Sequence, residues 1–308
     1  MLVFSNLNLS LIQTLLSGLV VINLLSILSE TNAQHKINLT DPKQNLDSFI
    51  KTRASLDGSQ VVFWWTGSIY SFIEGERSQH LFDFEGYNIA KAKKVENGYL
   101  LLTKEASFYK DPQSGEILAQ WKNPFTGTTV AVIQVWNDPV NQKLFLDDTR
   151  GKFHIPTTEL GDDLYWHLEI FLKYPSPLPR EQYPLYSQSN DYQAGELFQY
   201  YTKRSQLEDA TLPSVPCQIS WTRISPWLPW MEMGNRAGYL VYNCRGKKLS
   251  DGFQELPESI KSYVEKHHPE FQTAPDEFTE PNETSWTYFK KLLEQRAQKL
   301  NSSQKQND

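Results

Sequence analysis

The chain has 308 residues, of which 39% are hydrophobic and 21% charged, and this composition excludes disorder for the bulk of it. Its formal net charge is −6, with acidic and basic residues interleaved, so we expect no nucleic-acid partner. Aromatic residues reach 13%, which favours β-strands and stacking or interface surfaces.

Residues 1–33 are predicted to be a targeting segment. Residues 11–29 are apolar, and the small residues Thr31 and Ala33 follow them, which is typical of a secretory signal cleaved after Ala33. Because no Lys or Arg precedes Lys36 and the apolar run approaches spanning length, an uncleaved anchor or a soluble N-terminal helix is the alternative. As a signal or an anchor, the segment predicts export, with the protein periplasmic or membrane-anchored and facing the periplasm.

Residues 39–300 are predicted to form a single β-rich domain. Residues 41–56 open it with a short helix, since Asp41 can cap the helix and Pro42 suits its first position. Between about 60 and 175, short apolar runs alternate with turn signals, which predicts an antiparallel meander. Helical patterns return towards the C-terminus, and residues 301–308 are predicted to be a disordered tail.

The strand predicted at 164–174 has two different faces. With a period of two, one face carries Leu164, Trp166, Leu168, Ile170 and Leu172, and the other carries Tyr165, His167, Glu169, Phe171 and Lys173. We assign the first face to the core. The mixed second face suits the interior of a ligand-holding barrel, which makes Tyr165 a candidate ligand contact, or else an ordinary half-exposed strand.

The two cysteines, Cys217 and Cys244, flank two strand-like runs. If these runs pair as a hairpin with Cys217 opposite Cys244, apolar side chains face each other, with Trp221 opposite Leu240. Because an oxidising compartment permits it, a disulfide between the two is predicted at the base of the hairpin. Two unpaired buried thiols are the alternative.

The same hairpin encloses the loop at 224–238, ISPWLPWMEMGNRAG, in which Trp, Met and Pro are concentrated. An apolar lining with a few polar groups is typical of a small-molecule pocket, so the loop is interpreted as a lid over a barrel mouth. The candidate ligand contacts are Trp221, Arg223, Trp227, Trp230, Met233 and Arg236. The alternatives are a plug in the protein's own core, a membrane-surface contact and a surface for stacking sugars.

His167 and Glu169 are the candidates for catalysis. They lie two residues apart on one strand, so their side chains point the same way and suit an acid–base pair. The alternative is a structural hydrogen-bonded pair. No other histidine has the spacing of a further ligand, so no metal site is predicted, and no cofactor is assigned.

Several segments, taken in order, give the chain a family resemblance. They are VFWWTGSIYSF, FEGYNIAK, KDPQSGEIL, WKNPFTG, NDPVN and ISPWLPWMEMGNRAGYL. Together they resemble an uncharacterised bacterial family, domain of unknown function 1838, over about Leu39 to Glu294. The resemblance implies an exported bacterial protein and no particular reaction, so it identifies no catalytic residue.

The sequence thus predicts a mainly β fold, an antiparallel barrel or strongly curved sheet of calycin-like form, with a short N-terminal helix and C-terminal helices outside it. The expected function is binding of a largely apolar small molecule, such as a lipid, pigment or isoprenoid, by the exported protein. The alternatives are an enzyme that uses His167 and Glu169, and a non-catalytic envelope protein that contacts membrane or a partner through the Trp-rich loop.

Overall fold

The computed structural model describes residues 36–149 and 151–305. The predicted targeting segment, residues 1–33, and residues 306–308 of the predicted tail lie outside the described residues. The chain divides into two units, Met1–Ile37 and Asn38–Asp308, and the second contains every helix and strand described below. Within the described residues, no helix is long and apolar enough to cross a membrane.

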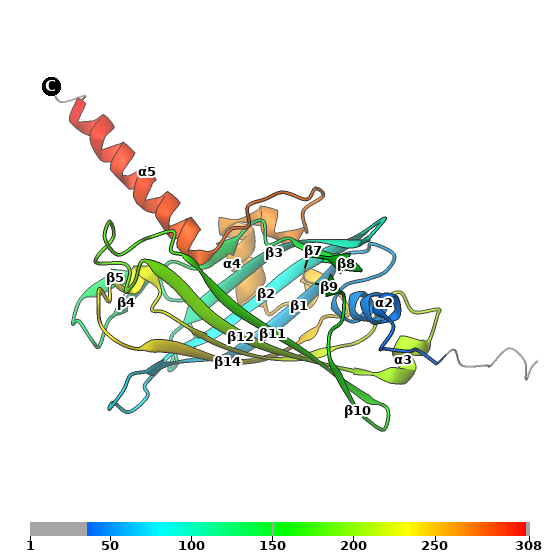
Figure 1. Cartoon of the computed structure of the whole chain (residues 1–308). Coiled ribbons are helices and arrows are strands. Elements are labelled where there is room, and N and C mark those ends of the chain that lie inside the picture. Colours follow the sequence, from blue (N-terminus) through cyan, green and yellow to red (C-terminus); the bar gives the residue numbers. More distant parts are fainter. Residues whose placement is uncertain (1–35, 150, 306–308) are drawn as a thin grey trace, which may run out of the picture. The chain divides into compact units, whose positions relative to one another are not determined.

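One antiparallel sheet of ten strands dominates the second unit (Figure 1). Its strands pair in the order β10–β11–β12–β13–β14–β1–β2–β3–β6, and β7 also pairs with β3. They are β1 (Val61–Phe72), β2 (His80–Val95), β3 (Gly98–Lys110), β6 (Val135–Asn137), β7 (Gln142–Phe145), β10 (Thr157–Leu160), β11 (Asp163–Pro175), β12 (Asp191–Lys203), β13 (Gln218–Ser225) and β14 (Tyr239–Lys248). Two short hairpins stand apart from it, β4 (Gln120–Lys122) with β5 (Thr129–Ala131) and β8 (Asp147–Asp148) with β9 (Gly151–Lys152). The mainly antiparallel β fold is confirmed, but the sheet ends at β10 and at β6 and β7 and does not close into a barrel.

The sheet bends near its centre, where glycines flank Trp65. In the strand register, Trp65 lies opposite Gly86 of β2 and opposite Gly246 of β14. A Cβ atom at Gly246 would overlap the carbonyl oxygen of Trp64, and one at Gly86 would overlap Ser107. Glycines inside strands allow tight bends, and a neighbouring aromatic ring can cover the gap they leave. The bend is large enough for β3, β11 and β12 to line one cavity.

The C-terminal segment covers the outer face of β1, β2 and β3. Buried side chains on that face are Val62, Tyr87, Ile89, Ala106 and Phe108, and they pack against Phe253, Leu256, Ile260, Val264 and Phe271. The partners come from η2 (Gly252–Glu255), α4 (Glu258–His267), η3 (Pro269–Gln272) and the link between η2 and α4. The inner face of the same strands is left to line the cavity.

Two further helices flank the sheet. The predicted N-terminal helix is α2 (Pro42–Arg53), and Asp41 caps it as expected, by accepting a hydrogen bond from the backbone N–H of Gln44 at 2.9 Å. At the other end of the chain, α5 (Ser285–Lys305) packs on the core through Trp286 and Phe289. It continues through residues 301–305, which the sequence placed in a disordered tail.

The Trp-rich loop is a plug in the core, so the lid interpretation is wrong. Trp230 lies in η1 (Pro229–Met231) and is only 3% exposed. Its indole packs against Phe82 and Tyr109, with ring centroids 5.7 and 5.2 Å away. The amide of Asn123 donates to the carbonyl oxygen of Met231 at 2.8 Å. The aromatic and sulfur-bearing side chains of the loop therefore fill space inside the protein and form no cover over an opening.

The predicted disulfide is wrong as well. β13 and β14 pair in a register shifted by four residues from the predicted one, so Trp221, and not Cys217, lies opposite Cys244. This register sets a large indole beside a small thiol, which in turn lies opposite Gly67 of β1. Both thiols are free and buried, as the alternative had it. Burial raises the pKa of each to about 12.

The plug gives a testable prediction. Trp230→Ala is expected to lower the free energy of unfolding by about 3–5 kcal/mol, because it empties a volume that the surrounding rings cannot refill. As a control, Phe72 is 59% exposed, and Phe72→Ala is expected to change the value by less than about 0.5 kcal/mol. Denaturant unfolding followed by fluorescence measures both, and equal losses would contradict the plug.

Candidate functional site

A cavity of about 350 Å³ lies on the inner face of the bent sheet. One wall is apolar and comes from β1, β11, β12 and β13. Its side chains are Phe63, Trp65, Leu168, Ile170, Leu172, Phe198, Tyr200, Ile219 and Trp221. The cavity thus combines the volume and the apolar surface that small-molecule sites have.

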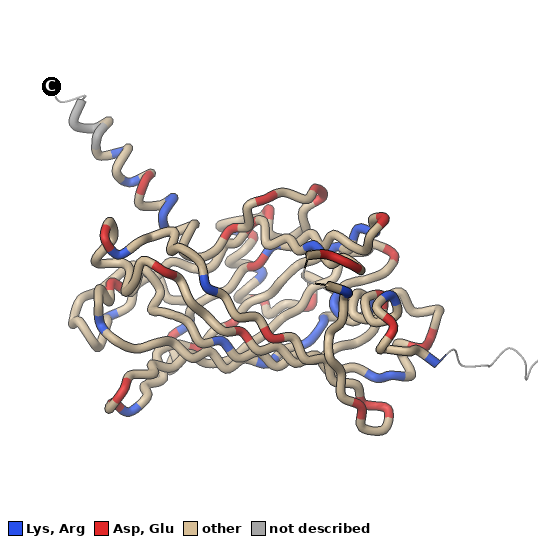
Figure 2. Tube along the Cα trace, in the orientation of Figure 1, with Lys and Arg blue, Asp and Glu red and all other residues tan. Residues whose placement is uncertain are grey.

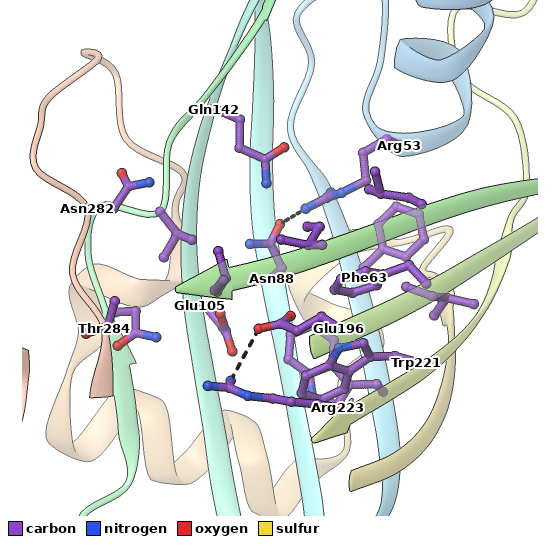
Figure 3. Close-up of a pocket in the computed structure, with 18 of the residues that line it drawn as sticks. Arg53, Phe63, Asn88, Glu105, Gln142, Glu196, Trp221, Arg223, Asn282 and Thr284 are labelled. Carbon is purple, nitrogen blue, oxygen red and sulfur yellow. Dashed lines mark hydrogen bonds and ion pairs between the residues drawn. The ribbon is translucent and has the colours of Figure 1, made fainter. Parts of the chain in front are cut away.

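Charged and amide side chains gather beside the apolar wall (Figure 3). They are Arg53 of α2, Asn88 of β2, Glu105 of β3, Glu196 of β12 and Arg223 of β13, and we refer to these five residues as the polar cluster. Figure 3 shows the side chains of Glu105, Glu196 and Arg223 converging, with Arg53 directed at Asn88. The five positions are far apart in the sequence, and the bend of the sheet brings them together.

Arg223 and Glu196 balance each other within the polar cluster. Nη1 of Arg223 lies 3.7 Å from Oε1 of Glu196, and Nη2 donates to the hydroxyl of Tyr192 at 2.6 Å. The guanidinium also lies over the ring of Tyr242, 5.6 Å from its centroid. Nε of Arg223 is buried with no hydrogen-bond partner in the described part of the chain. The charge of Arg223 is therefore balanced by Glu196, and its Nε–H remains available as a hydrogen-bond donor.

Glu105 titrates near neutrality. Burial raises the pKa of its carboxyl to about 7, and the negative charge of Glu196 acts in the same direction. Arg223, a hydrogen bond from Asn137 and the charge of Arg53 oppose the rise without cancelling it. A cavity-lining carboxyl that is neutral for part of the physiological pH range can donate as well as accept a hydrogen bond.

Arg53 is a buried cation that faces mainly neutral groups. It is 9% exposed, and its Nη2 donates to the amide oxygen of Asn88 at 2.6 Å. The guanidinium lies over the ring of Phe63, 5.1 Å from its centroid. Nη1 is buried without a hydrogen-bond partner among the described residues. Buried charges normally have an anionic partner, so Arg53 is the least satisfied member of the polar cluster.

Lys248 of β14 fixes the position of Arg53. Its ammonium donates to the carbonyl oxygens of Lys51 and Ala54 at 3.0 and 3.1 Å, and to the hydroxyl of Ser214 at 2.9 Å. Lys51 and Ala54 stand on either side of Arg53 in the chain. The end of α2 is therefore attached to the central sheet at the point where its arginine enters the cavity.

Residues just before and at the start of α5 complete the lining with Asn282, Glu283, Thr284 and Ser285. This stretch is fastened by a reciprocal pair of hydrogen bonds, because Asn282 Oδ1 accepts from the backbone N–H of Asn141 and Asn282 Nδ2 donates to its carbonyl oxygen, both at 2.8 Å. Glu283 is paired with Lys291 at 2.8 Å. Its carboxylate is therefore already balanced and adds little net charge to the cavity.

The structure brings two of the predicted ligand contacts, Trp221 and Arg223, to the cavity. Trp227, Trp230 and Met233 lie in the core and do not line it. Arg236 forms an ion pair with Glu76 at 3.0 Å, away from the cavity lining. These four positions were assigned on the assumption that the loop is a lid, and its burial as a plug removes them.

Of the two interpretations of the mixed face of β11, the half-exposed strand is confirmed and the ligand-facing surface is wrong. Its apolar residues Leu168, Ile170 and Leu172 line the cavity, while the mixed face, with Tyr165, His167 and Glu169, does not. His167 bonds the hydroxyl of Thr158 at 3.1 Å on an exposed surface. The reason is that the cavity presents an apolar wall, and its polar groups come from other strands.

The sequence analysis missed Arg53, Glu105 and Glu196. Glu105 and Glu196 stand at inner-face positions of strands whose neighbouring inner positions are hydrophobic or small, which was a readable signal. Arg53 had no such signal, because a basic residue in the last turn of a helix is ordinary. Among the described residues, no group of three or more His, Cys, Asp or Glu side chains could hold a metal ion.

The fold and the cavity define a class of protein: a mainly β protein whose curved antiparallel sheet carries a small-molecule-sized cavity with a polar cluster at its side. The chain belongs to the family described as protein of unknown function (DUF1838), whose model matches residues 58–293. This confirms the resemblance found in the sequence. No curated protein matches the chain.

Glu105 yields a prediction about stability and pH. Its pKa is about 7 in the fold against an ordinary 4.5, so the stability that the neutral carboxyl contributes is complete below about pH 4.5 and is lost as the pH rises through about 7. Glu105→Gln is therefore expected to raise the free energy of unfolding at about pH 8 by up to about 3 kcal/mol, and to change it little at about pH 4.5. Denaturant unfolding at the two pH values measures this, and a pH-independent effect would show that the carboxyl does not titrate as described.

Proposed function

We propose that the protein binds a largely apolar small molecule, of the lipid, pigment or isoprenoid class, inside the cavity of the sheet after export. The observation that carries the proposal is the pairing of a continuous apolar wall with a small set of polar groups, two of which keep unsatisfied N–H donors, Arg53 and Arg223. An apolar body with a polar head would match both parts. The volume of about 350 Å³ falls within the range of small-molecule sites, about 300–1,000 Å³.

The likeness to calycins is part of the same proposal. Closed eight-stranded barrels of that kind hold one small ligand in their interior. Here the sheet is open at its ends, yet its bend and the covering segments enclose a comparable space. Export rests on the apolar run at 11–29, which lies outside the described residues.

The geometry favours this function over the two alternatives from the sequence. An acid–base pair of His167 and Glu169 would stand outside this cavity, since both side chains are on the face of β11 that does not line it. A membrane contact through the Trp-rich loop needs exposed indoles, and those of Trp227 and Trp230 are buried. Binding in the cavity uses surfaces that are available as the chain is folded.

A pair of neighbouring substitutions on β11 tests the proposal. Ile170 lines the cavity, whereas the next residue, Phe171, is 76% exposed on the opposite face. Ile170→Trp is expected to weaken binding of a neutral fluorescent polyene alcohol about tenfold or more, because the larger side chain occupies the space of the ligand. Phe171→Trp is expected to leave the affinity unchanged.

Fluorescence titration of the wild type and both variants measures the effect, and mass spectrometry of an organic extract of the purified protein looks for a native ligand. Equal affinity of the two variants, or a wild type that binds no apolar probe and yields no extractable molecule, would refute the proposed function.

A further inference from the structure

We propose that the ligand is a long-chain monocarboxylic acid whose carboxylate binds the guanidinium of Arg53, beside the carboxyl group of Glu105. This inference rests on the proposed function and adds the chemical class of the ligand's head. It is built from the charges that line the cavity and from the way each of them is, or is not, balanced.

Arg53 lacks a full counter-ion. Its hydrogen-bond acceptor, the side chain of Asn88, is neutral, and its Nη1 has no partner in the described ranges. Its position at the end of α2 supplies only about half a unit of negative charge. The remaining positive charge, enclosed against aromatic rings, favours an anion in the cavity.

Glu105 does not serve as that counter-ion. A carboxylate held by an arginine has a lowered pKa, whereas the pKa of Glu105 is raised. No salt bridge joins it to Arg53 or to Arg223 among the ion pairs of the described residues. Below neutral pH it is therefore largely protonated and can donate its own hydrogen bond to a bound oxygen.

The sum of charges within the polar cluster selects a monoanion. Arg53 and Arg223 contribute two positive charges, Glu196 contributes one negative charge, and protonated Glu105 contributes none, which leaves a net charge of about +1. Two other charged residues line the cavity, but Arg245 is exposed to solvent and Glu283 is paired with Lys291. A monocarboxylate neutralises the net charge of the cluster. A phosphate dianion would leave a buried excess of negative charge, which costs free energy.

The apolar wall accommodates the tail of such an acid. Leu168, Ile170 and Leu172 follow one another along the inner face of β11, and Phe198 and Ile219 extend the surface onto β12 and β13. A flexible alkyl or polyene chain can follow this wall from the head group. Burial of its methylene groups supplies the nonspecific part of the affinity.

Binding of the acid is expected to weaken with rising pH, because ionised Glu105 repels a carboxylate. The charged or titratable groups around Glu105 are Arg53 from α2, Tyr109 from its own strand, Glu196 from β12 and Arg223 from β13. Lys248, near Arg53, titrates in the same range, since burial lowers its pKa to about 7. If binding requires protonated Glu105, the affinity falls about tenfold between pH 6 and pH 8.

The first experiment compares head groups. A fluorescent long-chain polyene fatty acid, the matching alcohol and the matching methyl ester are titrated into the wild type at about pH 6, where a carboxylic acid is already ionised. The acid is expected to bind about tenfold or more tightly than the alcohol and the ester, because it alone gains a charge-assisted bond. Arg53→Met is expected to remove this preference, so that the acid binds no more tightly than the alcohol and the ester.

The matched control is Arg236→Met, which removes an arginine that has its own carboxylate partner outside the cavity. It is expected to leave the preference for the acid intact. Thermal melting of both variants verifies that they fold.

The second experiment removes the titrating group and does not depend on the Arg53 variant. Glu105→Gln is expected to bind the acid with nearly equal affinity at about pH 6 and about pH 8, whereas the wild type loses about tenfold. An undiminished loss in Glu105→Gln would assign the titration to Lys248 and overturn the role of Glu105.

The outcomes separate the two proposals. If the alcohol and the ester bind as tightly as the acid, the proposed function stands and the inference about the head group is overturned. If none of the three probes binds, both are overturned. A preference for the acid that survives Arg53→Met would overturn the assignment of the anion to this arginine.

Discussion

The site depends on how closely the backbones of β1, β2 and β14 approach one another. Gly86 and Gly246 flank Trp65 on its two neighbouring strands, and neither has room for a Cβ atom. Without side chains at these positions the strands can approach closely and the sheet can bend. The cavity that β3, β11 and β12 line together, and the convergence of five polar side chains on it, follow from this bend.

The cavity contains charged side chains that do not all contribute to the stability of the fold. Arg223 and Glu196 form a pair that also involves Tyr192, and such a pair can be close to neutral in its effect on stability. Arg53 and Glu105 are different, because each keeps a charge or a proton that the fold does not fully stabilise. Groups of this kind persist where a structure uses them, which is why they identify the site better than the aromatic residues do. The aromatic residues, numerous as they are, mostly build the core.

Local patterns in the sequence predicted most helices and strands. They did not predict the features that depend on how distant segments are arranged, such as strand register and the side of the sheet that forms the cavity. The cap at Asp41, the run of antiparallel strands and the C-terminal helices follow from turn chemistry and periodicity, which act over a few residues. The two faces of β11 were separated correctly by period two, but which of them lines a cavity depends on the direction in which the whole sheet bends, and a local period does not contain that information. The register of β13 and β14 was wrong by four residues for a related reason: a shift by an even number of residues keeps the same faces, so the hydrophobic pattern cannot detect it. The function of a Trp-rich loop cannot be predicted from its composition for a similar reason, since a loop that covers a pocket and a loop that fills the core need the same apolar residues.

Arg53 stands at the end of α2, ahead of the segment 58–293 that the family model matches. Glu105, Glu196 and Arg223 lie within that segment. Lys248 attaches that helix end to the sheet through backbone carbonyl groups alone, and carbonyl groups are present whatever the side chain at position 53 is. The anchoring and the charge are therefore separable. A relative whose first helix ended in a different residue would keep the same cavity and the same attachment, but would lose this positive charge from the cavity lining.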